Sequence, residues 1–326
     1  MKFVVTGGGQ RSRAVWAQEW KHYEQAIALT VDWDTGCAER LIEYNSPEDV
    51  ISEKDANIVF KAGSLVDEKL YMCTQTEVLI YDYPSLKLDR YISLPCFNDL
   101  HHVTKVDDRI AIVSTGLDML ILIDENDNIV NVYNSLGKEP WHKFSKSTDY
   151  RKVITTKPHE SHPNYIFQIG NEIWVSRFEQ KDAICITDNS KRINIGSERI
   201  HDGIVKGDKV YFTTINGTVC VVNKNTYKIE NIYDLNEAYN GNSPLGWCRG
   251  LHVEDDRLFI GFSALRSTKL RENLAWIKGG FKKSVEEMRA LPTRIVEYDF
   301  KTRSIVKELN LSDVGLDAVF SILKCD

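Results

Sequence analysis

The sequence has no long apolar run and no excess of basic residues, and each absence excludes a class of protein. No stretch approaches the length of a membrane span, and the apolar run at 3–5 is too short for a signal peptide. The net charge of −6 and the pI of about 5.8 argue against binding to nucleic acids or anionic membranes. We therefore expect neither a membrane nor a nucleic acid as a partner.

The chain also lacks the short motifs that mark common catalytic and metal sites. Its seven cysteines form an odd set without a Cys-x-x-Cys spacing, which favours reduced thiols and a cytoplasmic location. The zinc-protease pattern His-Glu-x-x-His and the hydrolase pattern Gly-x-Ser-x-Gly are missing too. Function therefore has to be inferred from how residues converge in the fold.

What the sequence does contain is a repeat with a polar or glycine-rich start, a tight turn and an alternating apolar strand. Its five copies lie at 61–72, 100–113, 162–175, 200–212 and 247–261. They can be aligned on the first apolar residue after the turn, which is Leu70, Ile110, Ile173, Val210 or Leu258. Successive copies are then 40, 63, 37 and 48 residues apart. A period near 40 with insertions is typical of the four-stranded blades of a β-propeller.

The two ends of the chain predict a further blade. Read one after the other, 319–326 and 2–8 resemble 101–116, so the last strand should pair with the first. Segments 26–31 and 38–44 would complete this blade and close the ring, which removes an open sheet edge. We predict an all-β fold over 1–326, a single β-propeller with six four-stranded blades. Five or seven blades are the alternatives.

Three segments do not fit the period, and the first of them, 9–23, is interpreted as a loop that leads into a short helix. Segment 137–160 is an insertion between blades, and segment 264–292 interrupts the last blade with apolar residues at helical spacing. Both carry several lysines and arginines, including Arg266, in an acidic protein. If both lie at one mouth of the propeller, the second as a short helical lid, they favour an anionic small molecule. A solvated basic rim is the alternative.

Four short segments resemble an uncharacterised family of propeller-like proteins, a domain of unknown function. They are Asp-Leu-His at 99–101, Asp-Asp-Arg at 107–109, Arg-Gly-Leu at 249–251 and Gly-Phe-Ser-Ala-Leu-Arg at 261–266. The resemblance covers about residues 60–312. It implies a propeller fold and brings no activity with it.

In a propeller the innermost strands line one axial channel, so equivalent residues of different blades should converge. Counting nine positions back from the aligned apolar residues gives Lys61, His101, Asn164, His201 and Arg249. Neighbouring positions add His102, His162, Asp202, Cys248 and His252. We therefore expect a polar ring at the mouth of the channel, although a wet channel without a ligand would also explain it.

The ring predicts a small-molecule site, and an enzyme is one use of it. His101, His162 and His201 would be acid–base groups, while Lys61 and Arg249 hold an anionic sugar-like or carboxylate substrate. His102, Asn164, Asp202 and Arg266 would be further ligand contacts. The reaction would be an elimination, an epimerisation or a hydrolysis.

Two other uses of the fold remain open. The cofactor is unknown, but a divalent metal held by His101, His162 and His201 would act as a Lewis acid. Alternatively, the chain is a non-catalytic propeller scaffold that binds a protein or a peptide. The fold cannot choose between these uses, because propellers host both.

Overall fold

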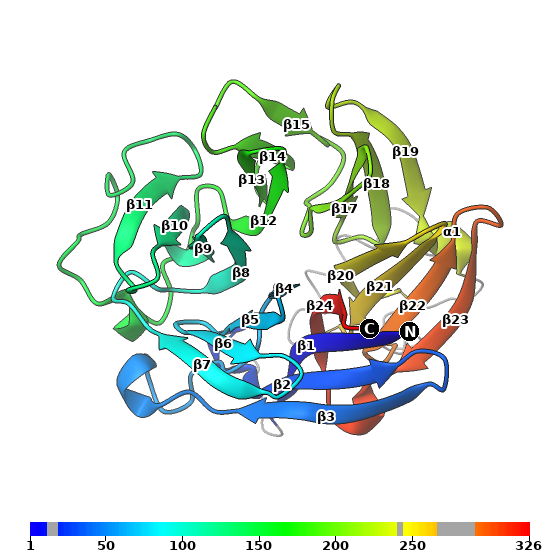
Figure 1. The fold of residues 1–326 in the computed structure, drawn as a ribbon, viewed down its shortest axis with the longest axis horizontal. Helices are drawn as coiled ribbons and strands as arrows, with labels where there is room; N and C mark the ends of the chain where they lie inside the picture. Colours follow the sequence, from blue (N-terminus) through cyan, green and yellow to red (C-terminus); the bar gives the residue numbers. More distant parts are fainter. Residues whose placement is uncertain (12–18, 240–243, 266–290) are drawn as a thin grey trace, which may run out of the picture.

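The computed structural model confirms a β-propeller of six four-stranded antiparallel blades (Figure 1). It describes residues 1–11, 19–239, 244–265 and 291–326. The blades lie around a common centre, and the two chain ends lie side by side (Figure 1). Among the described residues, no helix has the length and apolar character needed to cross a membrane.

The first three blades in chain order follow the predicted repeats. The first contains β4 (Ser64–Val66), β5 (Lys69–Cys73), β6 (Val78–Asp82) and β7 (Lys87–Ile92). The second contains β8 (Leu100–Val106), β9 (Arg109–Ser114), β10 (Met119–Ile123) and β11 (Ile129–Asn134). The third contains β12 (Pro163–Ile169), β13 (Glu172–Arg177), β14 (Asp182–Cys185) and β15 (Arg192–Asn194).

The remaining blades complete the ring. The fourth contains β16 (Ile204–Lys206), β17 (Lys209–Thr213), β18 (Thr218–Asn223) and β19 (Ile229–Asp234). The fifth contains β20 (Trp247–Glu254), β21 (Arg257–Ser263), β22 (Arg294–Asp299) and β23 (Ser304–Asn310). The sixth contains β24 (Ala318–Lys324), β1 (Lys2–Gln10), β2 (Tyr23–Asp32) and β3 (Cys37–Tyr44).

Helical segments are short and lie in the connections. The described helix is α1 (Leu235–Ala238), and the 3-10 turns are η1 (Glu19–Lys21), η2 (Glu48–Val50), η3 (Thr115–Leu117), η4 (Tyr150–Lys152) and η7 (Ser312–Val314). The predicted insertion 137–160 contains η4 and connects the second blade to the third. Most of the predicted helical lid, including Arg266, falls outside the described residues.

The acidic turn and the apolar strand of each repeat have direct structural causes. The turn between the first two strands of a blade places Asp67, Asp107 or Asp255 in the left-handed region, at φ of 51°, 54° and 49°. Aspartate tolerates this conformation better than most residues, which explains the acidic turn. The apolar strands that follow are buried because adjacent blades pack face to face; Ile80 and Ile112, for example, belong to one core cluster.

The chain ends pair as predicted, but in a register one residue away from the predicted match. Phe3 lies opposite Lys324, and Val5 lies opposite Ile322. The predicted match placed Lys2 directly after Asp326, whereas in the structure Met1 also lies between the two strands, where the chain ends take the place of a turn. The equivalent of His101 in the closing blade is therefore Phe320, not Val319.

Candidate functional site

Each blade contributes one residue, near the start of its innermost strand, to a ring around the axis. In blade order the ring residues are Lys61, His101, Asn164, His201, Arg249 and Phe320. The same count defines each ring residue. In every blade, one residue of the innermost strand pairs with the first apolar residue of the second strand, and the ring residue lies four positions before it. The structure thus brings the five predicted positions together and adds Phe320 as the sixth.

β-Bulges direct several of these residues out of their sheets. His101 and Asn164 have no counterpart on the neighbouring strand, because the pairing shifts by one residue at each position. The same shift occurs at Phe320, and Arg249 and Gly250 together lie opposite a single residue of β21. Bulges are frequent beside binding sites because the extra residue re-aims its side chain.

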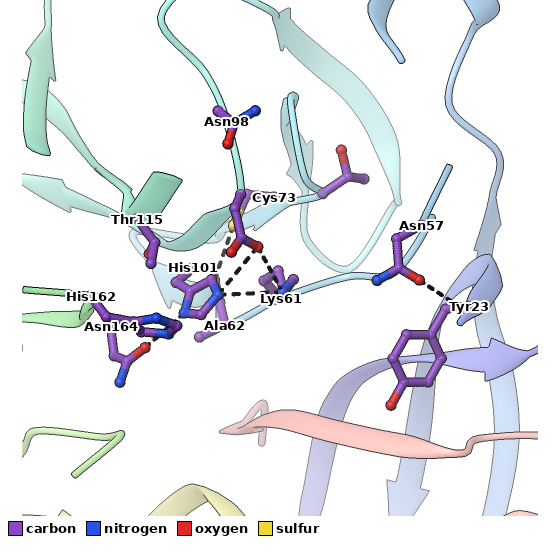
Figure 2. A network of polar contacts seen from close by, with 12 residues as sticks. Tyr23, Asn57, Lys61, Ala62, Cys73, Asn98, His101, Thr115, His162 and Asn164 are labelled. Carbon is purple, nitrogen blue, oxygen red and sulfur yellow. Dashed lines mark hydrogen bonds and ion pairs between the residues drawn. The ribbon is translucent and has the colours of Figure 1, made fainter. Parts of the chain in front are cut away.

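His101 is the centre of a polar network that joins three blades (Figure 2). Its Nδ1 lies 2.7 Å from the amide oxygen of Asn164, which can only accept, so Nδ1 carries the proton. In the neutral ring Nε2 is therefore the acceptor, and it lies 3.4 Å from the Lys61 ammonium. Lys61 also lies 3.2 Å from the carboxylate of Asp99, and Asp99 is 3.3 Å from His101 Nε2.

A second pair of imidazoles lies beside this network. The Nδ1 atoms of His159 and His162 are 3.0 Å apart, so one donates a hydrogen bond to the other. The His162 ring also meets His101 edge-on, with 4.9 Å between ring centroids. The Asp118 carboxylate holds this loop by accepting from the backbone N–H groups of Glu160, Ser161 and His162 at 2.8–2.9 Å.

On the opposite side, the ring combines aromatic and cationic groups. The Arg249 guanidinium lies 3.6 Å from the centroid of Phe320, and the Lys61 ammonium lies 5.1 Å from it. These cation–π contacts hold two positive charges next to one aromatic ring. His201 packs edge-on against Phe178, which also contacts His162.

These groups open into a cavity of about 890 Å³. It is lined by Lys61, Asp99, His101, His159, His162, His201 and Arg249, and residues 151 and 153–160 of the insertion also line it. Asn98 anchors this insertion, because its amide donates to the carbonyls of Tyr150 and Val153 at 2.8 Å. The basic insertion therefore lies at the same mouth as the ring.

Burial and neighbouring charges set the protonation of the cavity. Burial lowers the pKa of His101, and Lys61 lowers it further. Burial is also the main reason why the pKa values of His162 and His201 lie well below the ordinary value, and nearby imidazoles or Arg249 add to it. Burial alone would raise the pKa of Asp99, but Lys61 and His101 hold it well below its ordinary value. The imidazoles of the cavity are therefore neutral and the Asp99 carboxylate is ionised near neutral pH.

Three predicted ligand residues do not line this cavity. His102 stacks on Tyr165 between blades, at 3.7 Å between ring centroids, and its Nδ1 accepts the backbone N–H of Ile166. Asp202 lines a separate cavity of about 250 Å³ and accepts from Thr213 and the Gly250 N–H. Asn164 lies behind His101 and orients it. A ligand contact by any of these three residues therefore stays a prediction, at a position outside this cavity.

The metal alternative finds no matching geometry in the part of the chain that is described. There, no group of three or more His, Cys, Asp or Glu side chains is arranged to hold a metal ion. Part of the reason is that His101 uses Nδ1 for Asn164 and directs Nε2 toward a lysine ammonium.

Sequence reasoning missed Asp99, His159 and Phe320. Asp99 precedes a ring residue by two positions, so extending each count to flanking residues would have found it. Phe320 would have been found if Met1 had been counted in the closing turn. His159 lies in the insertion, where no period applies, and its only signal is another histidine three residues later.

Comparison with known proteins supports the fold and no more. No protein family model and no curated protein matches the sequence. A crystal structure of a protein of unknown function from Bacteroides caccae is similar with a TM-score of 0.62 and 10% identity, over 99% of this chain and 98% of that one. A chain in the crystal structure of a nidogen/laminin complex is similar with a TM-score of 0.59 and 6% identity, over the same shares. At these identities, the likeness identifies this chain by its fold alone, as a six-bladed β-propeller.

Proposed function

We propose that this propeller binds a small anionic molecule, sugar-like or a carboxylate, in the ring cavity. The observation that carries the proposal is that Lys61 and Arg249 line one cavity together with imidazoles of the ring and its neighbours. These imidazoles are those of His101, His162 and His201. Each cation comes from a different blade, so they meet only because the ring closes. Cations held in a partly buried cavity attract an anion more strongly than exposed ones do, because water screens them less.

The carboxylates at the rim do not cancel this attraction. Glu160 lies 3.1 Å from Lys138 and from His142, and Glu179 lies 3.8 Å from Arg199. Each of these carboxylates therefore has its own positive partner. Asp99, the third carboxylate that lines the cavity, contacts Lys61 directly.

Binding of simple anions tests the proposal. Isothermal titration with sulfate, methyl sulfate and succinate should detect saturable binding of at least one of them. Arg249→Gln should weaken that binding by about tenfold or more, since charge-assisted hydrogen bonds contribute about 1.5–3 kcal/mol. Arg109→Gln removes the same charge from the first residue of β9, which does not line the cavity, and it should leave the affinity unchanged. If none of the three anions binds, the proposal is wrong.

If the ligand is a substrate, His101 is the histidine best supported as its acid–base group. Its Nε2 is an acceptor fixed from behind by Asn164, and its ring lines the cavity. His162 and His201 are the other candidates. Elemental analysis of protein purified without a histidine tag tests the divalent metal that the sequence allows at these histidines.

A protein-binding scaffold is the alternative use of the fold. The large apolar side chains exposed in the described part of the chain include Leu88, Ile129, Ile232 and Val306. They lie on β7, β11, β19 and β23, the outer strands of four different blades. The polar cavity therefore gives the small-molecule proposal a defined site, which a protein partner does not yet have.

A further inference from the structure

A series of hydrogen bonds fixes where the proton lies on the His159 ring. The Thr156 hydroxyl makes its shortest hydrogen bond to the carbonyl oxygen of Gly116, which can only accept, so the hydroxyl donates to Gly116. The hydroxyl oxygen is then an acceptor for His159 Nε2, which lies 3.4 Å from it. The neutral His159 ring therefore carries its proton on Nε2, and its Nδ1 is an acceptor.

The same reasoning assigns the proton of His162. Its Nδ1 lies 3.0 Å from His159 Nδ1, and because the His159 atom accepts, His162 Nδ1 donates. Burial lowers the pKa of both rings, so His162 is neutral near neutral pH and its Nε2 keeps a lone pair. This nitrogen has no hydrogen-bond partner among the described residues, and His162 lines the cavity. His162 thus offers a hydrogen-bond acceptor to a ligand.

A neighbouring imidazole has unused hydrogen-bonding atoms as well. Neither ring nitrogen of His201 has a hydrogen-bond partner in the part of the chain that the structure describes. In either neutral tautomer this ring offers one donor and one acceptor. Phe178 contacts the rings of His162 and His201, at centroid distances of 4.9 Å and 5.5 Å, so the two imidazoles are neighbours in the cavity. This pair matches a hydroxyl group, which both donates and accepts.

We propose that the ligand of this cavity carries a hydroxyl group together with its anionic group, and that the hydroxyl donates to His162 Nε2. The inference rests on the proposed function and narrows its ligand class to hydroxy acids, including sugar acids. A carboxylate without a hydroxyl displaces water from His162 and leaves the accepting nitrogen unpaired, which lowers the affinity. A site that hydrogen-bonds a ligand hydroxyl discriminates for this reason against the analogue that lacks it.

Pairs of carboxylates with equal charge test the hydroxyl directly. Malate is succinate with an added hydroxyl group, and gluconate is the polyhydroxylated counterpart of hexanoate. Both enantiomers of malate are needed, because an imidazole nitrogen accepts from one direction only. In isothermal titration, at least one hydroxylated member should bind about tenfold or more tightly than its partner. Equal affinities within both pairs, or binding of sulfate without binding of any of these carboxylates, would overturn this inference and leave anion binding intact.

A variant assigns the selectivity to His162. His162→Phe removes the acceptor and keeps an aromatic ring, so the affinity ratio within the selective pair should fall to about one. His252→Phe makes the same change in the separate cavity and should keep the ratio. A melting temperature for each variant shows whether it folds. Because the ratio is measured within one protein, a general loss of affinity does not imitate the expected result.

The wild-type protein provides a test that needs no variant. The ¹⁵N chemical shifts of the His162 ring should show a proton on Nδ1 and none on Nε2. Addition of the tighter hydroxylated ligand should move the Nε2 signal, whereas its unhydroxylated partner should not. A proton on Nε2 in the free protein, or a ratio that survives in His162→Phe, would overturn this inference. Absence of binding by every anion tested would overturn both this inference and the proposed function.

Discussion

Asn164 fixes both the orientation and the tautomer of His101 from the neighbouring blade. The Asn164 oxygen accepts the Nδ1 proton at 2.7 Å, while its amide nitrogen donates to the carbonyl of Ile200 at 2.9 Å. Turning the amide over would break both bonds, and Asn164 is buried from competing water. His101 consequently presents an accepting Nε2 beside Lys61, on the cavity side.

Replacing Asn164 by leucine should remove the preference of His101 for the tautomer with the proton on Nδ1. The Asn164→Leu variant leaves the His101 Nδ1–H without an acceptor, so we expect a stability loss of about 1–3 kcal/mol. The ¹⁵N chemical shifts of the His101 ring should then indicate a mixture of tautomers. Asn225→Leu changes an asparagine in the turn after β18 and should alter neither quantity. Unchanged His101 shifts in Asn164→Leu would show that Asn164 does not control the ring.

His102 should make stability depend on pH. Burial lowers its pKa to about 3, whereas the unfolded ring titrates near its ordinary value of about 6.5. Between these values the unfolded chain binds a proton that the folded chain excludes. Stability is therefore complete above about pH 6.5 and falls by about 1.4 kcal/mol per unit as pH decreases toward about 3.

The variant His102→Gln isolates this contribution from that of the cavity histidines. Urea unfolding at pH 7 and pH 5 should show that the wild type loses about 2 kcal/mol more than the variant over this interval. Glutamine keeps an acceptor for the Ile166 N–H, so the variant should fold. Equal losses in the two proteins would mean that His102 is protonated in the folded state as well.

The fold could be predicted because a propeller repeats one local rule. The alternation of apolar residues and the acidic turns recur in each blade, so equivalent positions such as Lys61 and His201 follow by counting. Strand geometry also explains why His102 and Asp202 do not line the ring cavity. Successive side chains of a strand point to opposite faces, so a residue next to a ring position faces away from the cavity.

The rest of the site depends on side-chain contacts that the spacing of the blade repeat does not predict. His159 reaches His162 because Asp118, from another blade, organises the loop between them. The orientation of His101 depends on a partner 63 positions away in the chain. Such side-chain pairings are set by how blades pack, which a single sequence does not specify.

Arg249 and Phe320 should be energetically coupled. The guanidinium lies 3.6 Å from the ring centroid, and cation–π contacts contribute about 0.5–2 kcal/mol. A double-mutant cycle of Arg249→Met and Phe320→Leu, followed by chemical unfolding, should return a coupling energy in this range. Arg199 contacts Phe178 instead, so a cycle of Arg199→Met with Phe320→Leu should give less than about 0.5 kcal/mol. Similar values in both cycles would contradict a specific contact.

Gly7 should be essential to the closure of the ring, because a side chain there meets the backbone of the closing strand. A Cβ atom at Gly7 would lie 1.7 Å from the carbonyl oxygen of Ala318, so β1 and β24 would have to separate. We expect Gly7→Ala to cost more than about 2 kcal/mol, the range of overpacked sites. It should also remove hydrogen-exchange protection from the amides that join the two strands.

Gly9→Ala is the matched control for this closure. At Gly9 the nearest atoms are a flexible Ile27 methyl at 3.3 Å and the Gly315 oxygen at 3.4 Å, so a methyl group fits after a small adjustment. Its effect on stability should stay below about 1 kcal/mol, since most surface or tolerated substitutions have small effects. Because the ring residues from six blades meet only in a closed ring, Gly7→Ala should also weaken anion binding, whereas Gly9→Ala should not. Equal melting temperatures for the two variants would show that the β1–β24 seam is not what holds the ring together.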